Sequence, residues 1–82
     1  MNRDIKINGL YKHFKGHLYR VIAIAYNSET YDEKAPEKAK MVVYENTDTK
    51  ETWVRPYDMF NSLVDKNKYP EVEQKYRFEE IE

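Results

Sequence analysis

The sequence predicts a mainly β protein, a small SH3-like or partly open five-stranded antiparallel barrel with one short helix. Three observations support this prediction. Several short runs alternate apolar or aromatic residues with polar ones, turn-forming residues separate the runs, and a chain of 82 residues is long enough for one domain and one core. An α+β roll is the alternative architecture.

The N-terminal third predicts two paired strands. Residues 1–8 alternate two isoleucines with polar neighbours, which is typical of an arm or a short edge strand. Residues 10–14 also alternate with a period of two, and Lys15-Gly16 then predicts a tight turn because glycine adopts positive φ easily. Residues 17–27 form the second expected strand, which is apolar on both faces at its middle, as in a strand bent across a barrel.

The rest of the chain supplies a long loop, three strands and the helix. The charged segment 28–40 predicts a long hairpin loop, and the β-branched and aromatic residues of 41–45 and 52–55 predict strands. Proline at the start of 56–64 favours a helix there, with four apolar residues at helical spacing as its buried stripe. After a charged linker, 76–81 is expected to close the sheet.

The composition excludes several classes of function. The chain has no cysteine, so it forms no disulfide, and its two histidines fall short of a structural zinc site. We expect no metal and no cofactor. No apolar run approaches the about 20 residues of a membrane span, and the first ten residues lack the apolar segment of a signal peptide. These features predict a soluble cytoplasmic protein that does not bind membranes.

Charge is distributed unevenly along the chain. The net charge is −1, which argues against a protein that grips nucleic acid with its whole surface. Residues 1–20, however, hold five basic residues and one acidic one, whereas residues 42–82 hold six basic and ten acidic ones. The N-terminal hairpin is therefore the expected basic surface.

A basic and aromatic contact face is the main candidate site. It combines the hairpin "YKHFKGH" with the strand "WVR", and its expected ligand-binding residues are Tyr11, His13, Lys15, Glu29, Trp53 and Arg55. Trp53 and Arg55 are two apart on one strand and so face the same side of the sheet. As the largest apolar side chain, Trp53 is expected to anchor the core; on an open face, it would form a cation–π or base-stacking platform with Arg55.

Catalytic features are sparse. There is no nucleophile elbow, phosphate-binding glycine loop or HExxH motif. His13 and His17 are expected to make local hydrogen bonds, and the Glu29 segment "SET" is expected to satisfy backbone groups in a turn. Glu29 could also pair with Lys15 or Arg55, and His13 with Glu29 is the acid–base pair that an enzyme would use.

Several blocks of the sequence resemble a small family of bacterial proteins catalogued as domain of unknown function 1653. The matching blocks stand in order along most of the chain: "GLYKHFKGHLYRV", "SET", "VVY", "WVRPYDMF" and the terminal "YRF". Asn27 stands where the family often has a histidine before "SET", and the stretch between Thr30 and Met41 looks longer than usual. The resemblance supports the fold and implies no biochemical role.

Three functional hypotheses follow. The first is a non-enzymatic module that recognises a protein or peptide partner through the basic and aromatic face. The second is a module for single-stranded RNA, in which basic residues contact phosphates and aromatic ones stack on bases. The third is an enzyme, or an enzyme accessory domain, that uses His13 and Glu29. We also expect a monomer or a weak homodimer, the dimer forming when the arm 1–8 adds to a neighbour's sheet and buries Ile5 and Ile7.

Overall fold

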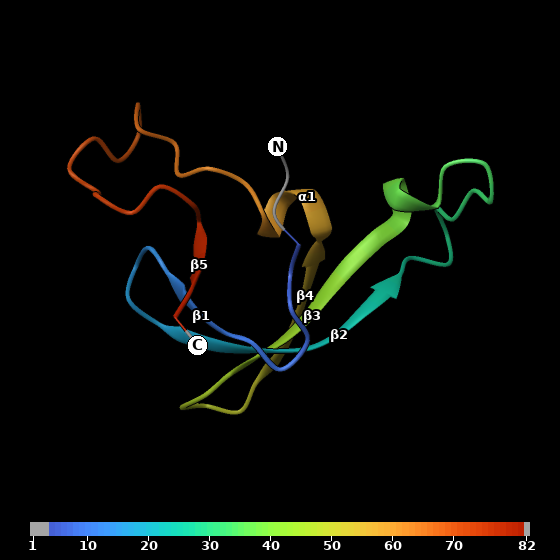
Figure 1. The fold of residues 1–82 in the computed structure, drawn as a ribbon, viewed down its shortest axis with the longest axis horizontal. Coiled ribbons are helices and arrows are strands. Elements are labelled where there is room, and N and C mark those ends of the chain that lie inside the picture. Colours follow the sequence, from blue (N-terminus) through green and yellow to red (C-terminus); the bar gives the residue numbers. More distant parts are fainter. Residues whose placement is uncertain (1–3, 82) are drawn as a thin grey trace.

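One antiparallel sheet of five strands makes up most of the fold. In this computed structural model, which describes residues 4–81, the strand order is β4-β3-β2-β1-β5 (Figure 1). The strands are β1 (Leu10–His13), β2 (Leu18–Tyr26), β3 (Lys40–Asn46), β4 (Thr52–Pro56) and β5 (Phe78–Glu80). The prediction of a mainly β protein with five antiparallel strands and one short helix is confirmed.

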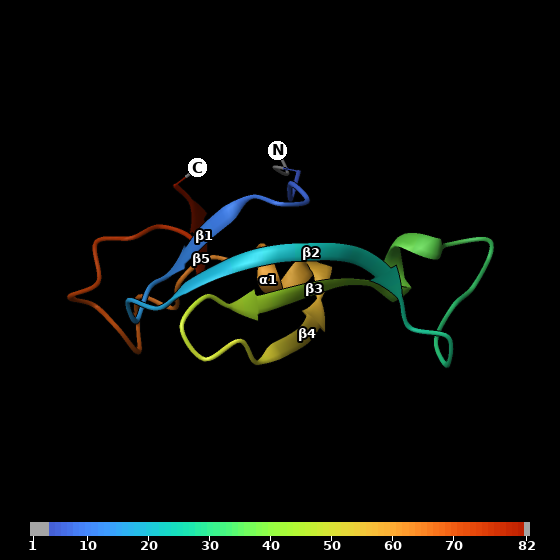
Figure 2. The ribbon, with the colours of Figure 1, turned by 90° about the horizontal axis from the view of Figure 1, so that it is seen from below.

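The prediction of a barrel is wrong, because the sheet stays open. The strands β4 and β5 form its two edges and do not pair with each other. Instead, Leu63 and Tyr76 form an isolated antiparallel bridge, and Arg77 N donates to Ser62 O over 2.8 Å. The segment after the helix therefore pairs with the residues that lead into β5. A closed barrel would instead need β4 to pair with β5. Figure 2 shows the sheet as a curved layer with β2 running along its length.

The helix α1 (Tyr57–Phe60) is a single turn, shorter than the predicted 56–64. It ends early because the chain leaves to pair with residues 75–77, with Val64 N donating to Lys75 O over 2.9 Å. As a result, only half of the predicted apolar stripe is buried: Phe60 and Val64 are inside, whereas Met59 and Leu63 are about half exposed. A 3-10 helix, η1 (Pro36–Ala39), stands in the connection between β2 and β3.

The core is aromatic and lies between the concave side of the sheet and α1. Its members are Ile5, Tyr11, Val21, Val42, Tyr44, Phe60 and Phe78. The rings of Phe60 and Phe78 stack with their centroids 4.0 Å apart, and the Tyr11 ring meets Phe60 edge-on at 5.5 Å. Such ring pairs each contribute about 0.5–1.5 kcal/mol beyond their buried area.

The N-terminal segment joins this core and forms no strand within residues 4–9. Ile5 is buried, and its backbone N donates to the Tyr57 hydroxyl over 2.9 Å. Ile5 thus packs into the core of its own chain. Ile7 remains exposed, and residues 1–3 of the expected arm lie outside the described residues.

The β1–β2 hairpin turns at the predicted place. Gly16 has φ of 105°, a conformation that disfavours other residues, and its N donates to His13 O over 2.7 Å. This tight turn holds Phe14 and Lys15 beside the end of β1. The predicted Lys15-Gly16 turn is confirmed.

Candidate functional site

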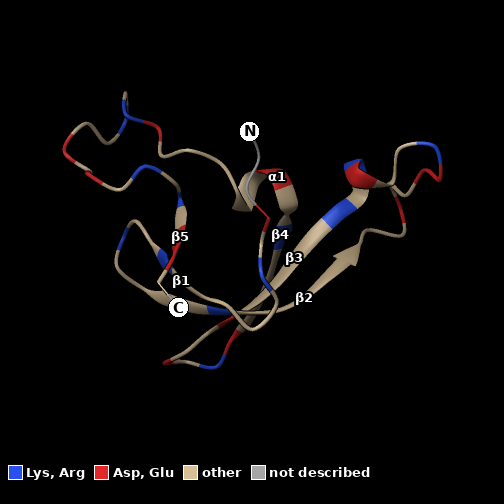
Figure 3. Cartoon of the chain, in the orientation of Figure 1, with Lys and Arg blue, Asp and Glu red and all other residues tan. Residues whose placement is uncertain are grey.

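A pocket of about 350 Å³ opens where the β1–β2 turn faces the segment 64–69. It is lined by His13, Phe14, Lys15, Arg55, Val64, Asp65, Lys68, Tyr69 and Arg77. These residues come from four separate parts of the chain. Lys and Arg (blue in Figure 3) occur on several neighbouring segments at the end of the molecule that carries β1 and β5.

Strand register aims His13 and Arg55 toward the concave side. His13 lies opposite the buried Phe78, and Arg55 lies opposite the buried Val42. Directly opposed residues of antiparallel strands point to the same face of the sheet. Arg55 Nε donates to the Tyr44 hydroxyl over 3.2 Å, and its guanidinium carbon lies 5.8 Å from the centre of the Phe78 ring. These contacts fix the Arg55 guanidinium at the pocket.

Arg77 is held at the pocket by its backbone but not by its side chain. Its N donates to Ser62 O over 2.8 Å, and its carbonyl accepts from Phe14 N over 3.0 Å. The Nε of Arg77 is buried and has no hydrogen-bond partner among residues 4–81. A buried donor without an acceptor destabilises a fold by about 1–3 kcal/mol. Arg77, which lines the pocket, therefore keeps one donor that the described residues leave without an acceptor.

The pocket carries more positive than negative charge. Two lysines and two arginines line it, whereas Asp65 is its one carboxylate. Asp65 Oδ1 accepts a hydrogen bond from Asn67 N over 3.0 Å. Within residues 4–81, the one ion pair joins Lys6 to Glu80. No described carboxylate therefore forms an ion pair with a cation of the pocket.

His13 is the neutral donor of the site. Its burial, followed by nearby positive charges, lowers the pKa of His13 from 6.5 to about 4, so the ring is neutral at pH 7. The charges belong to Arg55, Arg77, Lys15 and His17. His13 Nδ1 accepts from Lys15 N over 3.1 Å, which leaves the proton of the neutral ring on Nε2. His13 therefore adds an N–H donor to the site but no positive charge at pH 7.

Aromatic rings form one wall of the pocket. The Phe14 ring stacks on His13 at 4.5 Å between centroids and meets the Tyr69 ring at 4.9 Å. Lys15 Nζ lies 5.9 Å from the Phe14 centroid and 5.8 Å from that of Tyr69, and Lys68 Nζ lies 5.5 Å from Tyr69. Both ammonium groups thus lie within cation–π range of this wall.

Of the six expected site residues, the fold brings three together: His13, Lys15 and Arg55 line the same pocket. Tyr11 does not belong to the contact face, because it is 1% exposed and its hydroxyl accepts from Lys6 N over 3.0 Å. Tyr11 lies on the concave face, opposite Tyr19, and packs in the hydrophobic core.

Trp53 is not the core anchor that its size predicts. It is 49% exposed, because β4 is an edge strand and the core is already filled by Phe60 and Phe78. The register does place Trp53 and Arg55 on the same face, opposite Tyr44 and Val42. Even so, Trp53 does not line the pocket.

Glu29 lies at the opposite end of β2 from His13 and Lys15. It follows the far end of β2, whereas His13 pairs with the residue before the start of β2, so the nine residues of the strand separate them by roughly 25 Å. The fold therefore does not bring His13 and Glu29 together as an acid–base pair, and among residues 4–81 Glu29 forms no ion pair with Lys15 or Arg55. Glu29 N donates to Asn27 Oδ1 over 2.9 Å, as turn chemistry predicts.

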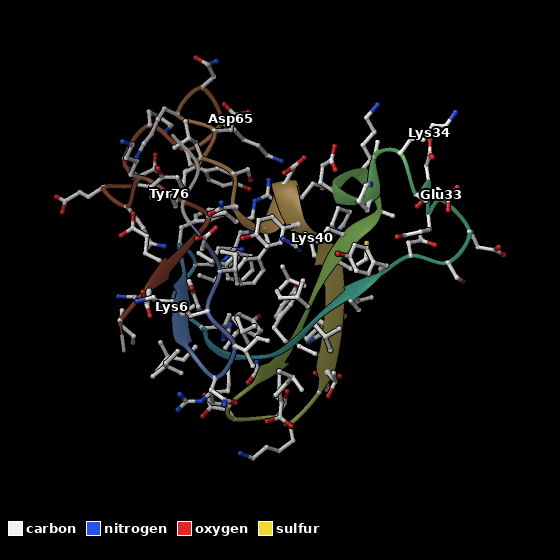
Figure 4. The ribbon with its side chains drawn as sticks, turned by 45° about the vertical axis from the view of Figure 1, so that its right-hand side comes forward. Lys6, Glu33, Lys34, Lys40, Asp65 and Tyr76 are labelled. Atoms are coloured by element: carbon white, nitrogen blue, oxygen red, sulfur yellow. The ribbon has the colours of Figure 1, made fainter. Side chains whose placement is uncertain are left out.

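The pocket residues that sequence reasoning missed are Phe14, Val64, Asp65, Lys68, Tyr69 and Arg77. Three of the six, Asp65, Lys68 and Tyr69, lie in the stretch interpreted as a charged linker. Figure 4 shows Asp65 and Tyr76 on one side of the molecule and Glu33 and Lys34 on the other. No periodic pattern in the sequence predicts that the 64–69 segment lies beside the hairpin. Its position depends on hydrogen bonds with residues 72–75, which only the structure shows.

The described part of the chain has neither a metal-binding cluster nor a membrane-spanning helix. Residues 4–81 contain no group of three His, Asp or Glu side chains that could hold a metal ion. None of the helices in this range has the length and apolar character needed to cross a membrane.

Comparison with known proteins gave one match. A family model described as "Protein of unknown function (DUF1653)" matches residues 9–80, nearly the whole chain and all of the pocket. No curated protein matches the chain, and no solved structure does.

Proposed function

Since this chain belongs to the DUF1653 family, whose description assigns no activity, we propose its function from the pocket: a non-enzymatic module that binds an acidic group of a protein or peptide partner. The observation that carries the proposal is a pocket with four cationic side chains, Lys15, Arg55, Lys68 and Arg77, that no described carboxylate neutralises by an ion pair.

Electrostatics explains why such a pocket needs a ligand. Like charges held together in a partly buried site repel one another, and an anion that enters removes this repulsion. Arg55 and Arg77 supply planar donors that match the oxygens of an acidic group. The lining residues include no Ser, Thr or Cys that could act as a nucleophile, which favours binding over catalysis.

The pocket favours a peptide over single-stranded RNA. A pocket of about 350 Å³ suits one acidic side chain, whereas RNA binding uses a groove that follows many phosphates. The rings of Phe14 and Tyr69 also contact each other and two lysines, so their faces are partly occupied. Segments of proteins that carry Asp or Glu provide the required acidic groups without any stacked base.

The proposal is tested by titrating the ¹⁵N-labelled protein with a hexaglutamate peptide at low ionic strength. We expect amide shifts to change around the pocket. Arg77→Gln weakens binding by about tenfold, because it removes charge-assisted hydrogen bonds. The matched control is Lys34→Gln, which removes one charge from an exposed loop at the opposite end of the molecule and leaves the affinity within about twofold.

Two results would contradict the proposal. If the shifts map away from the pocket, or if both variants weaken binding equally, the pocket is not the contact site. If an oligouridylate of matched charge binds more tightly than hexaglutamate and its affinity falls steeply with salt, the module binds RNA instead.

A further inference from the structure

We propose that the acidic group is a phosphate monoester, carried by a phosphorylated side chain of the partner protein; this inference rests on the proposed function and names its ligand. The observation behind it is the number and kind of unpaired donors around the pocket. A carboxylate brings one charge and two oxygens, whereas a phosphate monoester at pH 7 brings a charge of about −1.5 to −2 and three strong acceptor oxygens.

The donors of the pocket exceed what a carboxylate accepts. Arg77 offers a buried Nε–H without a partner, and Arg55 offers its terminal nitrogens, since its Nε is occupied by Tyr44. Lys15 and Lys68 add two ammonium groups, and neutral His13 adds Nε2–H. After the Asp65 carboxylate is subtracted, three positive charges remain, which a dianion balances better than a monoanion.

The charges come from both sides of the opening. Arg55 belongs to β4 and Arg77 directly precedes β5, whereas Lys15 and Lys68 belong to the two loops that face each other across the pocket. Tetrahedral oxygens point in several directions and so reach donors on both sides, which a planar carboxylate does less well. Clusters of arginine are a recurrent means of recognising phosphorylated segments.

The size and wall of the pocket fit a side chain rather than a larger molecule. Its volume of about 350 Å³ is at the low end of the range for small-molecule sites, about 300–1,000 Å³. Buried Val64 and the Phe14–Tyr69 wall provide apolar contacts for the carbon atoms that carry the phosphate. Both phosphoserine and phosphotyrosine present the required group, and separate peptides distinguish them.

The test compares fluorescently labelled peptides of one glycine- and alanine-based sequence. The central residue is phosphoserine, phosphotyrosine, glutamate or serine. We expect at least one phosphopeptide to bind about tenfold more tightly than the glutamate peptide, and the serine peptide not to bind. Inorganic phosphate should compete for the same site.

Measuring the affinity of both peptides as a function of pH tests whether the charge of the phosphate determines binding. When pH falls from about 7.5 to about 5, the phosphate loses its second charge, because that pKa is about 6. Any change in the charge of the protein itself affects both peptides in the same direction, because both carry an anion to the same pocket. The ratio of phosphopeptide to glutamate affinity should therefore shrink several-fold, and a constant ratio would overturn the inference.

Two variants connect the preference to the pocket. Arg77→Lys keeps the charge but removes the planar guanidinium. We expect it to reduce the ratio of phosphopeptide to glutamate-peptide affinity by several-fold. Lys68→Gln alters an exposed side chain, so folding is preserved, and it should weaken the phosphopeptide more than the glutamate peptide. Equal binding of both peptides in the pocket would overturn the phosphate inference and leave the proposed function standing. Binding of neither would overturn both.

Discussion

At the scale of single residues, His13 connects the stability of the fold with the charge of the pocket. Its ring stacks on Phe14 and meets Phe78 edge-on at 4.8 Å, so it belongs partly to the core. The same ring faces several cations that oppose its protonation. A histidine in this setting stays neutral at pH 7 and can act as a hydrogen-bond donor through Nε2.

The lowered pKa of His13 predicts a loss of stability in mild acid. The unfolded chain takes up a proton near pH 6.5, whereas the folded chain takes it up only near pH 4. Stability is therefore unaffected above pH 7 and falls as pH decreases from about 6.5 to about 4. Because the ring is partly exposed, we expect the loss to be about 1–2 kcal/mol, less than the full shift implies.

Urea unfolding at pH 7 and at pH 4.5 measures this effect. His13→Asn keeps an acceptor for Lys15 N and removes the titration, so it should lose less stability between the two pH values than the unmodified protein. His17→Asn, at an exposed position, is the matched control and should retain the full pH dependence. A His13→Asn protein with the same acid sensitivity as the unmodified one would contradict the explanation.

At the scale of elements, α1 illustrates how tertiary pairing overrides a local pattern. The apolar spacing of 56–64 predicts two turns or more, but only Tyr57–Phe60 is helical. An isolated helix this short is not stable in water, so packing must hold it. Phe60 provides this packing, with its ring stacked on Phe78 and in edge contact with Tyr11 and Tyr44.

Truncating Phe60 should therefore remove much of the stability of the domain. Phe60→Ala is expected to lower the free energy of unfolding by about 3–5 kcal/mol, through lost burial and the cavity that remains. Met59→Ala, on the same turn but 48% exposed, should change it by less than about 1 kcal/mol. Chemical denaturation measures both. Similar losses for the two variants would show that the turn itself, rather than the Phe60 contact, is the source of stability.

At the scale of the whole molecule, the open sheet creates both the core and the pocket. Its curvature surrounds α1, and the 61–77 segment crosses the open side near β5 (Figure 1). The pocket forms where this segment meets the β1–β2 turn. The N-terminal segment, by contrast, packs under α1 through Ile5 and ties the beginning of the chain to its middle.

The packing of Ile5 predicts how the arm contributes to assembly. Ile5→Ala should lower the free energy of unfolding by about 2–4 kcal/mol and leave the mass in solution unchanged, because the contact lies within one chain. Ile7→Ala, at a position 56% exposed, is the control and should alter stability little. Denaturation and light scattering give the two readouts. A fall in mass without a loss of stability would assign Ile5 to a subunit interface instead.

The sequence by itself determined the strands, the Gly16 turn and three residues of the pocket. These features depend on local rules: period-two alternation, the positive φ of glycine, and basic residues placed on a hairpin. His13 and Lys15 could be predicted because they are neighbours on one turn, and Arg55 because it alternates with Trp53 on one strand.

Only the tertiary structure decided the rest. The sheet stays open because residues 62–64 pair with 75–77, a contact between two irregular segments that no periodicity announces. The same contact carries Lys68, Tyr69 and Arg77 to the hairpin and leaves Glu29 at the opposite end of β2. Burial was equally non-local: Tyr11 is inside and Trp53 half outside because position in the sheet, central or edge, outweighs the size of a side chain.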